Sequence, residues 1–303
     1  MATQPFKPSG PDSPTGRIPR TIGLAGGTGK MGMMFKRLFE ADGQTVLVAG
    51  RSTSLTFEEL ARRSDVVIVS VPISHTGEVI QRIAPLLNPD QLFSDFTSIK
   101  SAPVAAMLKS AAQVVGCHPI FGPMGQPEGQ NVVLCPARPG DLAPWYREFF
   151  TRHGMRVHEM TPAEHDEAMG VIQGLTHFIN IAFAKTLETR GVDLQRILNV
   201  CSPVYRVTFA MLSRILSGDP ALYSQIQMAN RESLPVIREF LKNGLQMIQA
   251  VEQQDAAGLD RIFRQSADFL GDYKTVARME SDLLIERMTD HVRNPRGESP
   301  LDE

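Results

Sequence analysis

The feature that most constrains this chain is a glycine-rich turn close to its N-terminus. The apolar segment 21–25 predicts a buried β-strand and runs directly into a G-x-G-x-x-G pattern, which an amphipathic stretch follows. Glycines at this spacing let the backbone turn tightly and approach a pyrophosphate, whose charge the helix N-terminus stabilises. The pattern alone is a weak signal, but here strand, turn and helix come in the required order. We therefore predict a dinucleotide-binding turn made of Gly27, Thr28, Gly29, Lys30, Met31 and Gly32.

Apolar runs and amphipathic stretches alternate regularly through the first half of the chain. Further strands are predicted at 45–49, 66–71, 92–95, 114–117, 132–135 and 156–158, and helices near 30–42, 75–87 and 101–112. Strands that are apolar on both faces are typical of a parallel sheet with helices on each side. This half therefore has the pattern of an α/β, Rossmann-type, doubly wound parallel sheet.

The pattern changes near Thr161. Thr161 and Glu164 have the spacing of a capping box, and Pro162 stands at the first helical position. A long helical pattern is expected from there to about Arg190, where Gly191 can end it, and only helical patterns follow. We predict a flexible tail at 1–20, a dinucleotide-binding domain at 21–160, an all-α domain at 161–292 and a second flexible tail at 293–303.

Charge and composition exclude several classes of protein. The formal net charge of -2 gives no basic field to hold nucleic acid. The longest apolar run, 66–73, is far shorter than the roughly 20 residues that span a bilayer. The three cysteines are widely spaced and form no pattern of a disulfide framework or a zinc site. We expect a cytoplasmic protein that acts on a small molecule, without metal, membrane or nucleic-acid partner.

The end of the second predicted strand bears on the choice of nicotinamide cofactor. Domains that bind NAD usually place Asp or Glu there, to accept a hydrogen bond from the ribose 2′-hydroxyl. Here Gly50 stands at that point, followed by Arg51 and Ser52. Arg51 can pair with a 2′-phosphate and stack on adenine, although a solvated loop arginine is the alternative. The pattern favours NADP and leaves NAD open.

Two residues with acid–base chemistry follow neighbouring predicted strands. Ser98 follows the strand at 92–95, and His118 follows the strand at 114–117. Both therefore lie at the carboxyl edge of the sheet, where ligands of such folds bind. A histidine there can accept a proton near neutral pH, and a serine hydroxyl can orient it. The alternative for His118 is a structural role in a loop.

Several polar residues lie within otherwise apolar segments of the predicted helical domain. Asp166, Gln173, His177 and Asn180 share one face of the long helix, either as the wall of a substrate pocket or as a network between helices. Arg206 and Arg214 lie eight residues apart on a predicted apolar helix. Either can clamp a carboxylate in a bidentate way, or can simply cover apolar surface with its stem.

Taken together, these motifs resemble the prephenate dehydrogenase family. The matching stretches are Gly27–Gly32, Val69–Ile73, Asp95 to Lys100, Gly116–Pro123, His165–Asp166, Gln173–Phe178, Arg214, Asp219–Pro220 and Tyr223. The resemblance covers about residues 21–285 and is nearest to the dehydrogenase half of bifunctional chorismate mutase/prephenate dehydrogenases.

The resemblance implies oxidative decarboxylation of prephenate to 4-hydroxyphenylpyruvate, a step toward tyrosine, with hydride transfer to NAD(P). It implies His118 as the catalytic histidine and Ser98 as the residue that orients it. It also implies a homodimer, formed through the helical domain. The substrate-binding residues that it implies are Arg214, His177, Asp166, Gln173 and Tyr223, and Val71 and Pro72 join the cofactor site.

Two alternatives remain open at this point. One is the same chemistry on an amino analogue, either arogenate or 4-amino-4-deoxyprephenate. The other is a cofactor-binding sensor that has lost turnover, against which the joint presence of Ser98, His118 and Arg214 argues.

Overall fold

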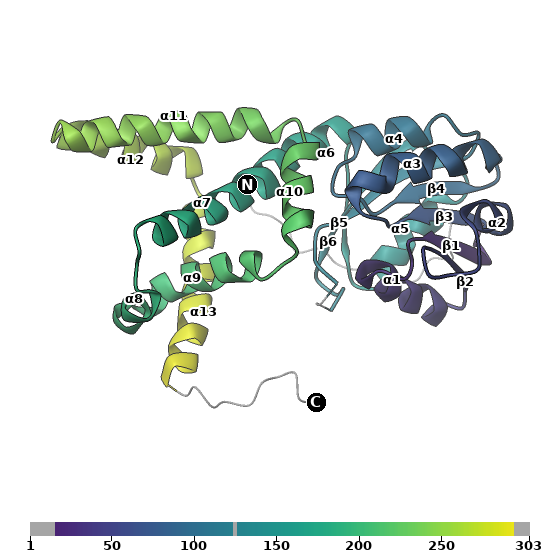
Figure 1. Ribbon diagram of the computed structural model, residues 1–303, viewed down its shortest axis with the longest axis horizontal. Helices are drawn as coiled ribbons and strands as arrows, with labels where there is room; N and C mark the ends of the chain where they lie inside the picture. Colours follow the sequence, from purple (N-terminus) through teal and green to yellow (C-terminus); the bar gives the residue numbers. More distant parts are fainter. Residues whose placement is uncertain (1–15, 124–125, 294–303) are drawn as a thin grey trace. The chain divides into compact units, whose positions relative to one another are not determined.

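The computed structural model describes residues 16–123 and 126–293 (Figure 1). The chain divides into two compact units: one runs up to Gly170 and includes Met228–Glu232, and the other comprises Val171–Gln227 and the residues from Ser233 onward. In this division helix α6 (Pro162–Met169), expected as the start of the helical domain, belongs to the first unit. Of the two predicted tails, residues 1–15 and 294–303 lie outside the described residues.

The first unit is built on one seven-stranded sheet. Its strands are β1 (Thr21–Ala25), β2 (Thr45–Ala49), β3 (Val66–Val69), β4 (Leu92–Asp95), β5 (Gln113–Pro119), β6 (Asn131–Arg138) and β7 (Arg156–Glu159). They lie in the order β2-β1-β3-β4-β5-β6-β7. Strands β1 to β5 are parallel, whereas β6 pairs antiparallel with β5 and parallel with β7. The predicted doubly wound sheet is confirmed, with its last two strands running the other way.

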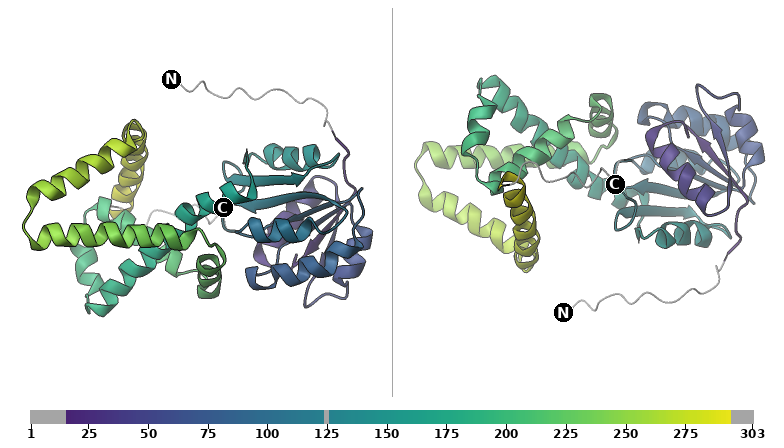
Figure 2. Two further views of the ribbon diagram at one scale, coloured as in Figure 1. Left: turned by 90° about the horizontal axis from the view of Figure 1, so that it is seen from above. Right: turned by 90° about the horizontal axis from the view of Figure 1, so that it is seen from below.

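Helices cover both faces of this sheet (Figure 2). They are α1 (Lys30–Ala41), α2 (Phe57–Arg63), α3 (Ile73–Ile83), α4 (Ser101–Met107) and α5 (Ala143–Arg152), and a 3₁₀ turn at Ala84–Leu86 extends α3. One apolar core packs α1 and α5 against the sheet through Phe35, Phe39 and Trp145. The other packs α2, α3 and α4 through Leu60, Ile80 and Val104. Alternate side chains of the buried strands thus pack into two separate cores, one on each face of the sheet. This is expected for parallel strands that lie between two layers of helices.

The second unit contains helices alone among its described residues. They are α7 (Thr176–Thr189), α8 (Leu194–Val200), α9 (Pro203–Leu216), α10 (Pro220–Ala229), α11 (Ser233–Glu252), α12 (Ala256–Leu270) and α13 (Tyr273–Arg293), of which α10 ends in the first unit. Within residues 16–123 and 126–293, no helix combines the length and the apolar character that crossing a bilayer demands.

The helical pattern expected from Thr161 to about Arg190 is present, but a π-helical segment interrupts its α-helical winding. Helix α6 ends at Met169, and a π-helical segment, Gly170–Leu175, separates it from α7. A methyl group on Gly170 would lie 2.9 Å from the carbonyl oxygen of Glu232, so the chain at 232 packs directly on this segment. Because a π-helix is wound more widely than an α-helix, the 3.6-residue spacing does not carry across it.

Candidate active site

The glycine-rich turn joins β1 to α1 and leaves no room for a side chain at Gly26, Gly27 or Gly32. A Cβ on Gly32 would lie 2.6 Å from the Cα of Gly27, and Gly26 has a φ of +92° with Val71 packed against it. Helix α1 begins at Lys30 with no side-chain cap and no acidic residue in its first turn. Its first amide groups can therefore face an anion, and the turn fits a dinucleotide pyrophosphate.

The end of β2 lies beside this turn. A Cβ on Gly50 would lie 3.2 Å from the hydroxyl oxygen of Thr28. Arg51 and Ser52 follow and are exposed, and among the described residues the Arg51 guanidinium has no ion-pair partner. Pro72, also exposed, precedes α3 at the end of β3. The residues predicted for the cofactor thus cluster around the carboxyl ends of β1, β2 and β3.

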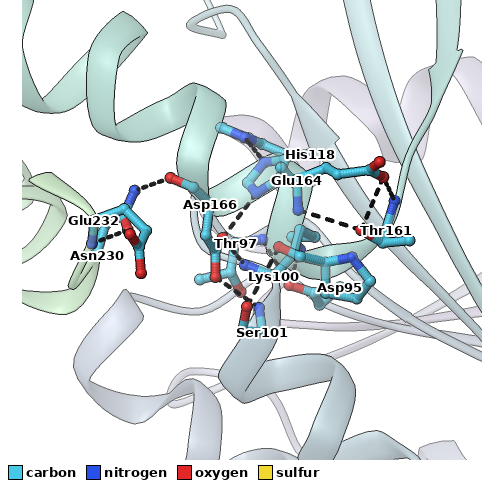
Figure 3. A network of polar contacts seen from close by, with 12 residues as sticks. Asp95, Thr97, Lys100, Ser101, His118, Thr161, Glu164, Asp166, Asn230 and Glu232 are labelled. Carbon is cyan, nitrogen blue, oxygen red and sulfur yellow. Dashed lines mark hydrogen bonds and ion pairs between the residues drawn. The ribbon is translucent and has the colours of Figure 1, made fainter.

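His118 lies near the end of β5 and is 3% exposed. Its Nδ1 is 2.8 Å from Nε2 of His165, a fully buried residue of α6. Nδ1 of His165 is in turn 2.8 Å from Oδ1 of Asp166 (Figure 3). The three side chains form a continuous hydrogen-bonded chain, which we call the histidine chain. In the part of the structure that is described, Nε2 of His118 has no hydrogen-bond partner.

Asp166 anchors this chain to the start of α4. Its Oδ1 accepts the backbone N–H of Lys100 at 2.7 Å, and its Oδ2 accepts that of Ser101 at 2.9 Å. Burial acts to raise the pKa of Asp166, but hydrogen bonds from His165, Ser101 and the Lys100 backbone outweigh it and lower the pKa to about 2. The carboxylate is therefore ionised at neutral pH, and both of its oxygens accept hydrogen bonds from the protein. The substrate contact expected for Asp166 remains a prediction.

Burial dominates the acid–base behaviour of both histidines. It lowers the pKa of His118 well below 6.5, and the neighbouring His165 and Lys100 act in the same direction, whereas Asp166 opposes them. Burial also lowers the pKa of His165, against the hydrogen bond to Asp166. Both imidazoles are therefore neutral at physiological pH, the state in which His118 can accept a proton.

Lys100 is a further buried ion at this edge of the sheet. Its ammonium group pairs with Asp95, and both side chains are fully buried. It also donates to the carbonyl oxygen of Cys117 at 2.8 Å, the residue immediately before His118. Gly116 gives it room, because a Cβ there would lie 3.1 Å from Cδ of Lys100. Lys100 thus ties the end of β4 to the backbone that carries His118.

Ser98 occupies the expected edge of the sheet but has a different relation to His118. It is half-buried in the segment between β4 and α4. Among the described residues its hydroxyl makes no hydrogen bond to His118, whose Nδ1 is taken by His165. The orienting role of Ser98 remains a prediction.

The second unit holds the other predicted substrate residues. The ring of His177, in the first turn of α7, meets the ring of Tyr223 of α10 edge-on at 4.8 Å. Nδ1 of His177 and Oε1 of Gln173 are buried without partners among the described residues. Buried polar atoms without partners are uncommon, which favours contact with a polar ligand. Asn180 instead donates to the carbonyl of Thr176, one turn earlier on its own helix.

The two candidate arginines of α9 differ in what they bind. The guanidinium of Arg206 donates to the carbonyl oxygen of Leu198, near the end of α8, at 3.1 Å. Arg214 is exposed, and within the described residues it has no ion pair or hydrogen bond. Arg206 therefore has a structural partner, and Arg214 is the arginine available to an anion.

Two family models match the chain over most of its length. Residues 44–156 match the nucleotide-binding domain of prephenate dehydrogenase, and residues 161–265 match its dimerization domain. The chain is also 34% identical over 271 residues to the T-protein of Haemophilus influenzae, an alignment that covers 89% of this chain and 72% of that protein. The chain belongs to the prephenate dehydrogenase family. As a prephenate dehydrogenase family member it is an NAD(P)-dependent dehydrogenase.

Other members of the prephenate dehydrogenase family show its range. The chain is 30% identical over 271 residues to the 4-amino-4-deoxyprephenate dehydrogenase of Streptomyces pristinaespiralis, covering 82% of this chain and 91% of that protein. The fold matches the crystal structure of prephenate dehydrogenase from A. aeolicus in complex with hydroxyphenyl propionate and NAD+. The TM-score is 0.65 at 20% identity, over 83% of this chain and 97% of the other.

Two residues of the site had no role assigned from the sequence, although both lie in the family motifs. His165 stands beside Asp166 just after a capping box, so a His-Asp pair in the first turns of a capped helix was the available signal. Lys100 lies five residues after Asp95 in an otherwise apolar setting, and a cation there needs a buried partner.

Proposed function

We propose that this protein catalyses the oxidative decarboxylation of prephenate to 4-hydroxyphenylpyruvate. The observation that carries the proposal is His118, a buried neutral imidazole at the carboxyl edge of a dinucleotide-binding sheet. Its Nδ1 is engaged by His165, and its Nε2 is left for a ligand. Membership of the prephenate dehydrogenase family supports the same reaction.

His118 acts as the base. A nicotinamide cofactor held at the turn Gly27–Gly32 would supply the acceptor for the hydride that leaves ring C4. As that hydride leaves, positive charge develops at C4, and Nε2 of His118 relieves it by taking the proton of the 4-hydroxyl group. The ring carboxylate departs as carbon dioxide, its bonding electrons make the ring aromatic, and His118 returns the proton to the oxygen. Arg214 binds a carboxylate of the dianionic substrate, and His177 and Gln173 contact its polar groups.

A turnover assay tests this function directly. The purified protein is incubated with prephenate, arogenate or 4-amino-4-deoxyprephenate, each with NAD and with NADP, and the reduced cofactor is followed by its absorbance. We expect the highest kcat/KM with prephenate. Turnover of 4-amino-4-deoxyprephenate alone would establish the second candidate, which the Streptomyces pristinaespiralis relative favours. Saturable cofactor binding without turnover of any of the three would overturn both.

We further propose NADP as the preferred cofactor, because Gly50 leaves the adenosine end of the site without an acid. Gly50→Asp would place a carboxylate beside Thr28, at the position of the missing acid. Like charges brought together at an interface cost several kcal/mol, so the variant should bind NADPH at least about tenfold more weakly. NADH binding should change much less.

The matched control is Gly50→Asn, which has the same shape without the charge. Fluorescence titration of NADPH and NADH with the three proteins gives the dissociation constants without any turnover. If the unaltered protein bound NADH as tightly as NADPH, the proposed preference for NADP would be contradicted. If Gly50→Asn and Gly50→Asp weakened NADPH binding equally, the size of the side chain rather than its charge would be the cause.

We propose that the protein is a homodimer that pairs through its second unit. Helices α11, α12 and α13 expose large apolar side chains, among them Leu245 (60% exposed), Phe263 (73%), Phe269 (87%) and Met279 (67%). Exposed apolar surface of this extent marks an interaction site. Light scattering at micromolar concentration should give twice the chain mass of 33.4 kDa. Phe269→Glu should shift the mass toward that of one chain, and a monomeric unaltered protein would exclude the dimer.

A further inference from the structure

The proton positions of the histidine chain follow from its last member, Asp166. Both of its oxygens accept backbone N–H groups, from Lys100 at 2.7 Å and from Ser101 at 2.9 Å. A backbone amide can only donate, so the carboxyl group can only accept in these contacts. With a pKa of about 2, Asp166 carries no proton at neutral pH.

The tautomer of each histidine is then determined in turn. Nδ1 of His165 lies 2.8 Å from an acceptor-only carboxylate, so it carries the proton. A neutral imidazole has one protonated nitrogen, so Nε2 of His165 holds a lone pair. That lone pair accepts a hydrogen bond from Nδ1 of His118 at 2.8 Å. His118 is therefore the Nδ1–H tautomer, and its lone pair is on Nε2.

This assignment of the His118 tautomer requires that His165 is neutral. A protonated His165 would donate from both nitrogens and could not accept from His118. Burial keeps it neutral by lowering its pKa. The other charged groups near the pair are Lys100 and Asp95, which neutralise each other in a buried ion pair.

We propose that His165 and Asp166 are positioning residues that hold His118 in the tautomer whose basic Nε2 is offered to the substrate. When Nε2 takes the proton of the 4-hydroxyl group, the Nδ1–H of the resulting imidazolium still donates to His165. The charge is thereby shared along a chain that ends on the Asp166 carboxylate. The inference deepens the proposed function and rests on His118 as its base.

The tautomer can be measured without substrate or turnover. The protein is labelled with ¹⁵N-histidine, and the His118 signals are identified by their loss in His118→Asn. At neutral pH we expect a protonated Nδ1 and an unprotonated Nε2 in His118. The opposite tautomer in the unaltered protein would overturn the inference whatever the substrate is. A failure of the proposed function would instead appear in the turnover assay of the unaltered protein.

Two variants of His165 test whether the tautomer of His118 affects kcat. His165→Phe keeps a ring but removes the acceptor, so His118 should lose its fixed tautomer. We expect kcat to fall about 10- to 100-fold, the range that a lost hydrogen bond to a charged group gives, with cofactor binding unchanged. His165→Gln retains an oxygen that can accept from His118, so the Nδ1–H tautomer and most of the rate should return.

Thr161→Ala is the matched control on the same helix. It removes the capping box that Thr161 forms with Glu164 at the start of α6 and leaves the histidine chain intact. It should lower Tm without changing the His118 spectrum or kcat. If Thr161→Ala lowered kcat as much as His165→Phe at equal loss of Tm, His165 would have only a structural role. The same conclusion would follow if His165→Phe retained the parental tautomer.

Discussion

Replacing His118 with Asn should lower kcat by about 10²–10⁴-fold, the usual contribution of general acid–base catalysis. Asn keeps a hydrogen-bonding group of similar reach but removes basicity, so the KM for substrate should change little. Steady-state kinetics with saturating cofactor measure both quantities. Retention of most of the parental kcat would exclude His118 as the base and make His177 the next residue to test.

The pH profile of the unaltered enzyme gives an independent check on His118. A protonated imidazole cannot accept the hydroxyl proton, so kcat should fall as the pH decreases through the pKa of His118. Because burial lowers that pKa, the acidic limb should lie below pH 6.5, and kcat should be on its plateau above that value. The limb should be absent in His118→Asn. Ser98→Ala should give a smaller loss with the limb unchanged, since the base remains and the histidine chain still holds it.

Much of the first unit could be predicted because its signals are local. Strands β1, β2 and β4 begin and end at the predicted residues, since each is a short apolar run between turn residues. Helix α2 was missed because seven residues give too little periodicity, although Thr56 and Glu59 form its capping box. The π-helical segment was missed because no local pattern marks it, and the chain at Glu232 that packs on Gly170 is distant in the sequence.

The candidate site also combines features that the local sequence predicts with contacts that it does not predict. The sequence placed His118 correctly at the end of β5, because the edge of a parallel sheet follows from strand order alone. It could not show that Asp166 bonds the backbone at Lys100, or that His165 rather than Ser98 contacts His118. Those contacts join residues 47 and 66 positions apart, and only the folded chain determines them.

Replacing Arg214 with Ala should raise the KM for substrate by about 30-fold to several thousand-fold. This corresponds to the roughly 2–5 kcal/mol lost when one partner is removed from a hydrogen-bonded charge pair that the bound substrate buries. The affinity for NADPH should stay nearly constant, because the residues predicted for the cofactor lie at the carboxyl ends of β1, β2 and β3 and do not include Arg214. Kinetics over a wide substrate range, together with NADPH titration, separate the two effects.

Arg206→Ala is the control from the same helix. Its guanidinium holds the carbonyl of Leu198, so its loss should lower Tm while the KM stays close to the parental value. Arg214→Lys should lie between the parent and Arg214→Ala, because an ammonium keeps the charge but not the planar fork that binds a carboxylate in a bidentate way. A near-parental KM in Arg214→Ala, with a raised KM in Arg206→Ala, would move the carboxylate contact to Arg206. It would also mean that the hydrogen bond from Arg206 to the carbonyl oxygen of Leu198 breaks when substrate binds.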